Sequence, residues 1–164
     1  MKRFRGPFFL IATVALAAIV AGTAFAAAQK KITFSGSYKG TVAEKVDGSN
    51  VTANATASGK GTVIGSSKLA GVVKATTANP PCSPLNGPGT ISGSKGKLNI
   101  TVVTGSRGCA ASADDQTDIT VSGTAKVAGG TGTFKKAKGT LHFSGHYDRK
   151  GGSFNVKLTG SLTY

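Results

Sequence analysis

The sequence predicts an all-β protein, an antiparallel eight-stranded barrel preceded by a cleavable signal peptide, with a β-sandwich as the alternative. Apolar residues recur at every second position through most of the chain after residue 31, which is the period of a strand with one buried face. Short links rich in glycine separate these runs, and 24 of the 164 residues are glycine. We prefer the barrel because closure leaves no exposed strand edge.

The first residues have the three parts of a secretory signal peptide: a basic start, an apolar run over residues 8–21 and a small-residue end. Cleavage after Ala26 gives a signal peptide of residues 1–26 and a single barrel domain of residues 27–164, and a cut after Ala28 is the alternative. An uncleaved anchor is the rival interpretation. We expect the mature domain to be secreted, or to lie in the periplasm or on the exterior of the cell envelope, with no membrane span.

The strands follow one another at short intervals along the mature chain. The expected strands are residues 32–46, 51–64, 68–76, 90–94, 98–102, 119–127, 141–147 and 153–164. Residues 47–50 turn the first strand into the second, and residues 149–152 make a hairpin of the last two. The alternation is clearest in the final strand, where Phe154, Val156 and Leu158 share one face.

Two irregular stretches, residues 79–88 and 106–116, interrupt the pattern. The first cannot be a central strand, because its prolines lack the ladder donor. Each stretch holds one cysteine, Cys82 or Cys109, and two cysteines in an exported chain most simply form one disulfide. This disulfide would stabilise the fold by about 3–4 kcal/mol and would tie the two stretches together at one mouth of the barrel.

The mature domain is strongly basic. The whole chain has a net charge of +14, and removal of the leader with its three basic residues leaves a net charge of +11. This charge favours contact with anionic surfaces. For an exported protein these are envelope polymers or lipid head groups, and nucleic acid is not expected; solubility is the plainer explanation of the charge. The residues expected to make such a contact are Lys135, Lys136, Lys138, Arg149 and Lys150.

Few side chains of the chain could carry chemistry, and we predict neither a metal nor a cofactor. His142 and His146 would lie roughly 13 Å apart on the outer face of one strand, too far apart to hold one zinc ion. Asp114, Asp115 and Asp118 could hold calcium through their oxygens, but a solvated acidic loop is the simpler expectation.

Glu44 is the one weak catalytic candidate. It has the even-numbered register of Phe34 and Tyr38, so its carboxylate would point inward, where burial raises a carboxyl pKa. A bulge or the strand end near Asp47 would instead turn it out to water.

The interior face also carries aromatic side chains that could line a pocket for a small apolar ligand. These are Phe34, Tyr38, Phe143, Tyr147 and Phe154. Small residues share the same face of the second strand, at Ala53, Ala55, Ala57 and Gly59. They either leave room for a ligand or let the walls close tightly.

Residues 129–139, GGTGTFKKAKG, resemble the GGTGxFxxAxG signature of allene oxide cyclase-like and dirigent-like barrels. The resemblance covers about the last 45 residues. It implies an eight-stranded antiparallel barrel with a central cavity, in which the signature lies between two strands. Apart from any family, Phe134 can plug one end of the apolar interior while the lysines that follow it point to solvent.

These features lead to three hypotheses of function. The first is an exported, non-catalytic binding module for a small apolar ligand. The second is an envelope-associated structural protein that contacts anionic polymers. The third is a cyclase-like or isomerase-like enzyme that uses Glu44.

Overall fold

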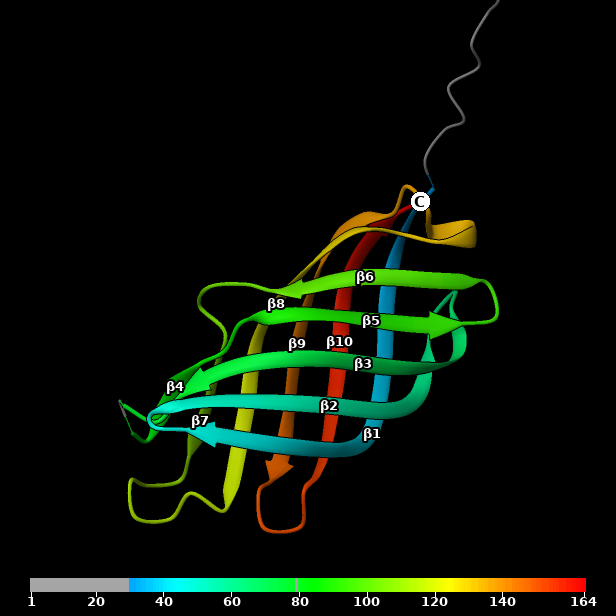
Figure 1. The fold of residues 1–164 in the computed structure, drawn as a ribbon. Helices are drawn as coiled ribbons and strands as arrows, with labels where there is room; N and C mark the ends of the chain where they lie inside the picture. Colours follow the sequence, from blue (N-terminus) through cyan, green and yellow to red (C-terminus); the bar gives the residue numbers. More distant parts are fainter. Residues whose placement is uncertain (1–29, 79) are drawn as a thin grey trace, which may run out of the picture.

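The computed structural model describes residues 30–78 and 80–164, and the predicted signal peptide lies outside them. The described chain forms one antiparallel sheet with a single 3₁₀ turn, η1 (Gly132–Phe134) (Figure 1). The strands are β1 (Lys31–Asp47), β2 (Asn50–Gly61), β3 (Gly65–Thr76), β4 (Cys82–Pro84), β5 (Gly87–Gly93), β6 (Gly96–Val102), β7 (Arg107–Ala110), β8 (Asp118–Gly130), β9 (Lys138–Asp148) and β10 (Ser153–Thr163).

The sheet closes on itself into an eight-stranded barrel. Its strands follow the order β8-β6-β5-β3-β2-β1-β10-β9, and β9 pairs back with β8 over its whole length. The two remaining strands, β4 and β7, pair with each other, and β7 continues the line of β6 along β8. The predicted eight-stranded antiparallel barrel is therefore confirmed, and the ladder between β8 and β9 rules out the sandwich.

The two stretches expected to be irregular each contain a short strand, which corrects that part of the prediction, although β4 lies at the edge of the sheet and is not a central strand. Cys82 of β4 lies directly opposite Cys109 of β7, with the Cα atoms 4.0 Å apart, and the two are joined by the predicted disulfide. Pro84 ends β4 after three residues because proline supplies no backbone N–H to continue a ladder. Proline thus shortens the strand but does not prevent it, since the facing strand and the disulfide hold the segment in place.

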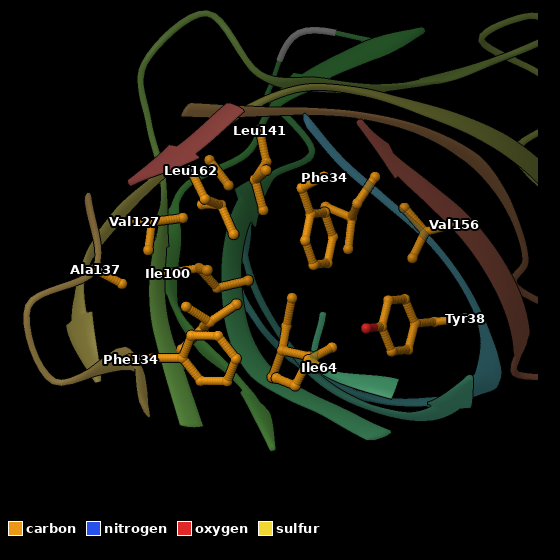
Figure 2. Close-up of a cluster of buried hydrophobic side chains, with 14 of the residues drawn as sticks. Phe34, Tyr38, Ile64, Ile100, Val127, Phe134, Ala137, Leu141, Val156 and Leu162 are labelled. Atoms are coloured by element: carbon orange, nitrogen blue, oxygen red, sulfur yellow. The ribbon is translucent and has the colours of Figure 1, made fainter. Parts of the chain in front are cut away.

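The interior is filled by side chains at one end of the barrel, which we call the packed end. This end holds the chain termini of the described part, η1, and the turns between β2 and β3 and between β5 and β6 (Figure 1). Phe134 of η1 is fully buried and points among the core side chains, and its ring meets that of Tyr164 edge-on at 5.4 Å between centroids (Figure 2). The prediction that Phe134 plugs one end of the barrel is confirmed.

The small residues of β2 act differently at different heights in the barrel. At the packed end a Cβ on Gly59 would lie 2.0 Å from the carbonyl oxygen of Ser37, so only glycine lets the two strands approach this closely. Ala57 is buried in the core, whereas Ala53 and Ala55, nearer the start of β2, line an open cavity. Both alternatives of the sequence analysis therefore occur, each in its own half of the barrel.

A buried serine repairs the break between β6 and β7. Ser106 is 2% exposed, and its Oγ accepts the N–H of Thr124 at 3.0 Å and donates to the Thr124 carbonyl at 3.3 Å. The Thr124 N–H is the group of β8 that an unbroken neighbouring strand would have bonded, whereas the Thr124 carbonyl also accepts the Val103 N–H at 3.0 Å. Gly123 is required beside it, because a Cβ there would lie 2.2 Å from the serine Oγ.

The buried tyrosine of the packed end predicts a loss of stability at alkaline pH. Burial raises the pKa of Tyr38, and the hydrogen bond of 3.0 Å to the Ser67 Oγ opposes that rise. The folded-state pKa is above the unfolded one, so this contribution is complete below the ordinary tyrosine pKa of about 10 and is lost as the pH rises through the folded value.

Tyr38→Phe should therefore lower the free energy of unfolding at about pH 8 by about 0.5–1.5 kcal/mol. Between about pH 8 and about pH 11, the unfolding free energy of the variant should fall by less than that of the wild type, because the variant has no phenol to deprotonate at this position. Denaturant unfolding of both proteins at the two pH values measures this difference. Deprotonation of lysines affects both proteins alike and cancels in the comparison. An equal alkaline loss in the two proteins would contradict the assignment to Tyr38.

Candidate functional site

The half of the barrel opposite the packed end contains an apolar cavity of about 210 Å³. Its wall is built from inward-facing residues of most of the barrel strands, because alternation sends every second side chain inside. The apolar side chains of this wall include Val42, Val51, Leu69, Val73, Ile100, Val102, Ile119, Val121, Val156 and Leu158. The cavity exists because β2 and β3 contribute only small groups at Ala53, Ala55 and Gly71.

Three of the five predicted pocket residues, Phe143, Tyr147 and Phe154, line this cavity. Phe34 and Tyr38 do not line it, which corrects their placement. They are 0% and 1% exposed and belong to the core of the packed end (Figure 2). The alternation of apolar residues in β1 correctly predicted that both side chains point inward. It did not indicate where along the barrel axis the packed core ends and the cavity begins.

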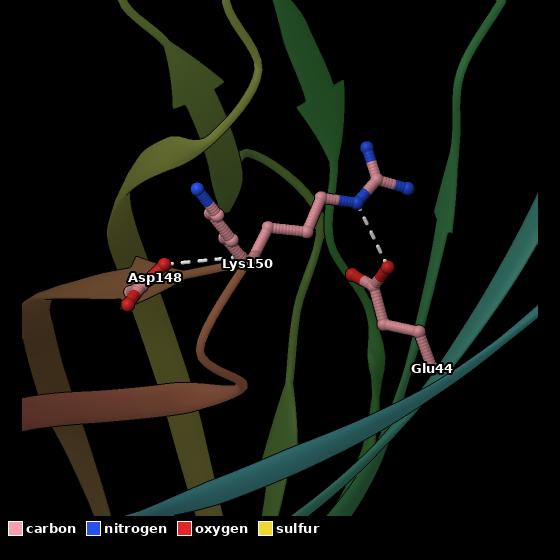
Figure 3. A network of polar contacts seen from close by, with 4 residues as sticks. Glu44, Asp148 and Lys150 are labelled. Atoms are coloured by element: carbon pink, nitrogen blue, oxygen red, sulfur yellow. Dashed lines mark hydrogen bonds and ion pairs between the residues drawn. The ribbon is translucent and has the colours of Figure 1, made fainter.

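The open end of the cavity, which we call the mouth, is marked by an ion pair between Glu44 and Arg149. The Nε of Arg149 donates to the Glu44 Oε2 at 2.9 Å (Figure 3). The Glu44 side chain is 20% exposed and the Arg149 side chain is 30% exposed, so both are largely withdrawn from water. The inward register expected of Glu44 is retained up to the mouth, and no bulge turns it outward.

The turn between β9 and β10 holds Arg149 in this position. The Asp148 Oδ1 accepts the N–H of Lys150 at 3.0 Å (Figure 3). It also accepts the N–H of Gly151 at 3.0 Å, and the two bonds fold the turn onto the aspartate. The N–H of Arg149 donates to the Thr117 carbonyl at 2.8 Å. The guanidinium is thus fixed by backbone bonds on one side and by Glu44 on the other.

Tyr147 completes the polar edge of the cavity. Its pKa is raised, first by burial and then by the nearby negative charge of Glu44. The phenol therefore stays protonated at neutral pH, so it can donate a hydrogen bond at the mouth. Gln116, Thr77 and Ser83 are further polar residues in the lining.

Arg149 was predicted to lie on an anion-binding surface, and the structure places it elsewhere. It faces the cavity because it continues the odd-numbered, inward register of Phe143 and Tyr147 past the end of β9. That register was visible in the sequence, but the residue was assigned to a solvated turn. Gln116 was also missed, because no periodic pattern covers the loop between β7 and β8.

The remaining predicted surface residues are not brought together. Lys135 and Lys136 follow η1 and Lys138 begins β9 at the packed end, whereas Lys150 lies at the mouth. The 11 residues of β9 separate the two places, which corresponds to about 36 Å of extended chain. These lysines are exposed, as predicted, but they form no single patch with Lys150.

The histidines and the acidic loop lie where the sequence placed them, on the outside. The His142 Nδ1 is 3.3 Å from the Thr124 Oγ1, and the His146 Nδ1 is 3.8 Å from an Asp118 carboxylate oxygen. Asp114 and Asp115 are exposed in the loop that precedes β8. Within residues 30–78 and 80–164 no three His, Cys, Asp or Glu side chains come together as metal ligands would.

Comparison with known proteins assigns no family to this barrel. A scan of protein-family models matched none of them, and searches of curated proteins and of solved structures returned no match either. The resemblance of residues 129–139 to the signature of allene oxide cyclase-like and dirigent-like barrels therefore stays a prediction. In the part of the chain that the structure describes, no helix has the length and apolar character needed to cross a bilayer.

Proposed function

We propose that the protein is a binding module that holds a small apolar ligand in the open half of the barrel. The observation that supports this most directly is that the interior is packed at one end and hollow at the other. A protein that needed only a stable barrel would gain stability by filling this space, since a cavity costs about 24 cal/mol per Å³. The hollow is lined mainly by apolar groups and has a few polar groups at its mouth, which is typical of ligand sites.

The size of the cavity defines the class of ligand. An engineered cavity of about 150 Å³ holds benzene, so about 210 Å³ suits a molecule of one ring or two small fused rings. The aromatic rings of Phe143 and Phe154 and the branched side chains of the wall offer contacts to a flat or branched hydrocarbon. Drug-sized ligands need a larger pocket than this one.

The mouth would orient the polar end of the ligand. Arg149 and Tyr147 offer hydrogen-bond donors and Glu44 offers acceptors, within one cluster. A ligand with one hydroxyl or carbonyl group could bond there while its hydrocarbon part fills the cavity. Catalysis by Glu44, as in a cyclase or isomerase, ranks behind binding because the carboxylate is already held by Arg149.

We also propose that the protein acts outside the cytoplasm. The sequence of the first 26 residues supports this, and so does the disulfide between Cys82 and Cys109, which forms and persists in oxidising compartments.

Ligand binding should raise the melting temperature of residues 27–164. Small probes such as indole and 2-naphthol, at about 100 times their dissociation constant, would stabilise the native state by about 2.7 kcal/mol, which is several degrees. Ala55→Leu extends a side chain into the cavity and should abolish the shift. Ala43→Leu makes the same change on the exposed outer face of β1 and should leave it intact.

Thermal unfolding of the three proteins with each probe measures these shifts. The proposal is wrong if no apolar probe of this size raises the melting temperature, or if Ala55→Leu responds as the wild type does.

A further inference from the structure

The acidic residues of the barrel gather at one of its two ends. All six acidic residues of the chain lie at or near the mouth, on the ends of β1 and β9, in the loop before β8, and at the start of β8. They are Glu44, Asp47, Asp114, Asp115, Asp118 and Asp148. The packed end carries lysines and no acidic side chain. We define the lysine end as Lys31, Lys95, Lys97, Lys135, Lys136 and Lys138, all of which are exposed.

Backbone contacts connect the segments that carry these lysines. The carbonyls of Lys95 and Lys97 accept the N–H groups of Thr133 and Thr131, both at 3.0 Å, which attaches the turn between β5 and β6 to η1. Lys135 and Lys136 follow directly after η1.

The other side of the lysine end is joined through β10. Lys31 of β1 and Lys138 of β9 both pair in register with Thr163, on either side of it. The six ammonium groups therefore belong to one continuous surface across the end of the barrel. In the described residues no lysine is within ion-pair distance of a carboxylate, so nothing in the barrel neutralises this surface.

We propose that the lysine end docks the barrel on an anionic lipid bilayer, with the mouth of the cavity facing away from it. Like charges gathered on one end repel each other, and an anionic surface would relieve that repulsion. The acidic residues at the mouth would be repelled by the same surface, so the position of the acids specifies an orientation as well as an attraction.

Several features favour a bilayer over a thin anionic polymer. The lysines lie on three separate segments, namely the start of β1, the turn between β5 and β6, and the link from η1 into β9. These segments are spread over an end of the barrel, which suits contact with an extended surface. Lysine is a point charge that needs no fixed bidentate geometry, so it can pair with head groups that are not held in one position. A shallow hollow rimmed by Lys135, Lys136 and Lys138 offers room for head-group atoms.

The surroundings of the lysine end agree with peripheral docking. Among the described residues the exposed large apolar side chains are Val46 and Val72, and neither is at this end, so contact would be electrostatic and reversible by salt.

The test is sedimentation of residues 27–164, which contain every strand and the whole core, with lipid vesicles. The vesicles are phosphatidylcholine alone, or an equimolar mixture with phosphatidylglycerol. We expect binding to the anionic vesicles only, and its loss between about 0.05 M and about 0.5 M salt, where the screening length falls from about 14 Å to about 4 Å.

Two variants with the same net charge distinguish a docking surface from general attraction. The first replaces five residues of the lysine end by glutamine: Lys95, Lys97, Lys135, Lys136 and Lys138. The second replaces five exposed lysines elsewhere: Lys39, Lys45, Lys74, Lys150 and Lys157. Binding should weaken at least about 100-fold in the first, since each lysine near an anionic leaflet contributes roughly fivefold, and less than about fivefold in the second.

Equal weakening of both variants would show that only net charge matters and would overturn the proposal. So would absence of binding to anionic vesicles, whether or not the protein binds a soluble polymer such as polyphosphate. The melting temperatures of both variants should match that of the wild type, because neither set of side chains makes a bond in the described structure.

Discussion

Phe134→Ala is expected to lower the free energy of unfolding by about 3–5 kcal/mol. The side chain is fully buried, and it closes the packed end by filling the space between the barrel walls and the ring of Tyr164. Removing it leaves a void that the walls cannot fill, because glycine contacts between neighbouring strands already bring them as close as they can come. A typical domain is stable by about 5–15 kcal/mol, so this loss would be a large part of the total.

Phe143→Ala is the matched control. Phe143 is only partly buried and faces the existing cavity, so its removal enlarges a space that is already hollow. We expect a loss of about half that of Phe134→Ala or less. Urea unfolding at neutral pH, followed by circular dichroism, compares the three proteins. Equal losses in the two variants would mean that η1 does not plug the barrel.

Loss of the disulfide should have the second-largest effect. Cys82 and Cys109 are 27 residues apart, and in the chain-entropy model a crosslink over this distance stabilises the native state by about 3–4 kcal/mol. The double variant Cys82→Ser with Cys109→Ser should lose about that much. The loss should come with opening of the β4–β7 pair, whose short ladder has few other contacts to hold it.

The same measurement with and without a reducing agent provides the control. Dithiothreitol should destabilise the wild type to nearly the level of the double variant and leave the double variant unchanged. A wild type whose unfolding free energy is the same with and without dithiothreitol, under conditions that reduce the bond, would contradict this account. The wall of the cavity includes Pro81, Ser83 and Gly108, so probe binding should weaken together with stability.

The two proposals fit one arrangement of the molecule. The cavity opens at the acidic mouth, and the lysine end is the opposite end of the barrel. A barrel docked by its lysine end would keep the mouth in water, where a ligand can enter. The two can also fail separately, because the thermal shifts depend on Ala55 and the vesicle binding depends on exposed lysines.

The sequence by itself determined the class of fold, most of the strands and which side chains point inward. A two-residue period assigns each side chain to a face, so Phe143, Tyr147, Phe154 and Glu44 could be placed inside without a structure. The cysteines could be paired because there were only two of them. The prediction that Phe134 closes one end of the barrel was possible because this apolar residue stands between a glycine-rich turn and three lysines.

Only the tertiary structure decided how far the interior is filled and which distant residues meet. Glu44 and Arg149 are 105 residues apart, and their contact depends on the register of three strands and on a turn folded by Asp148. The gathering of the acids at the mouth, away from the lysine end, depends on which turns lie at which end. A periodic pattern records the direction across a sheet, but position along the barrel axis is set by pairing between strands, and single sequences carry no local signal of that pairing.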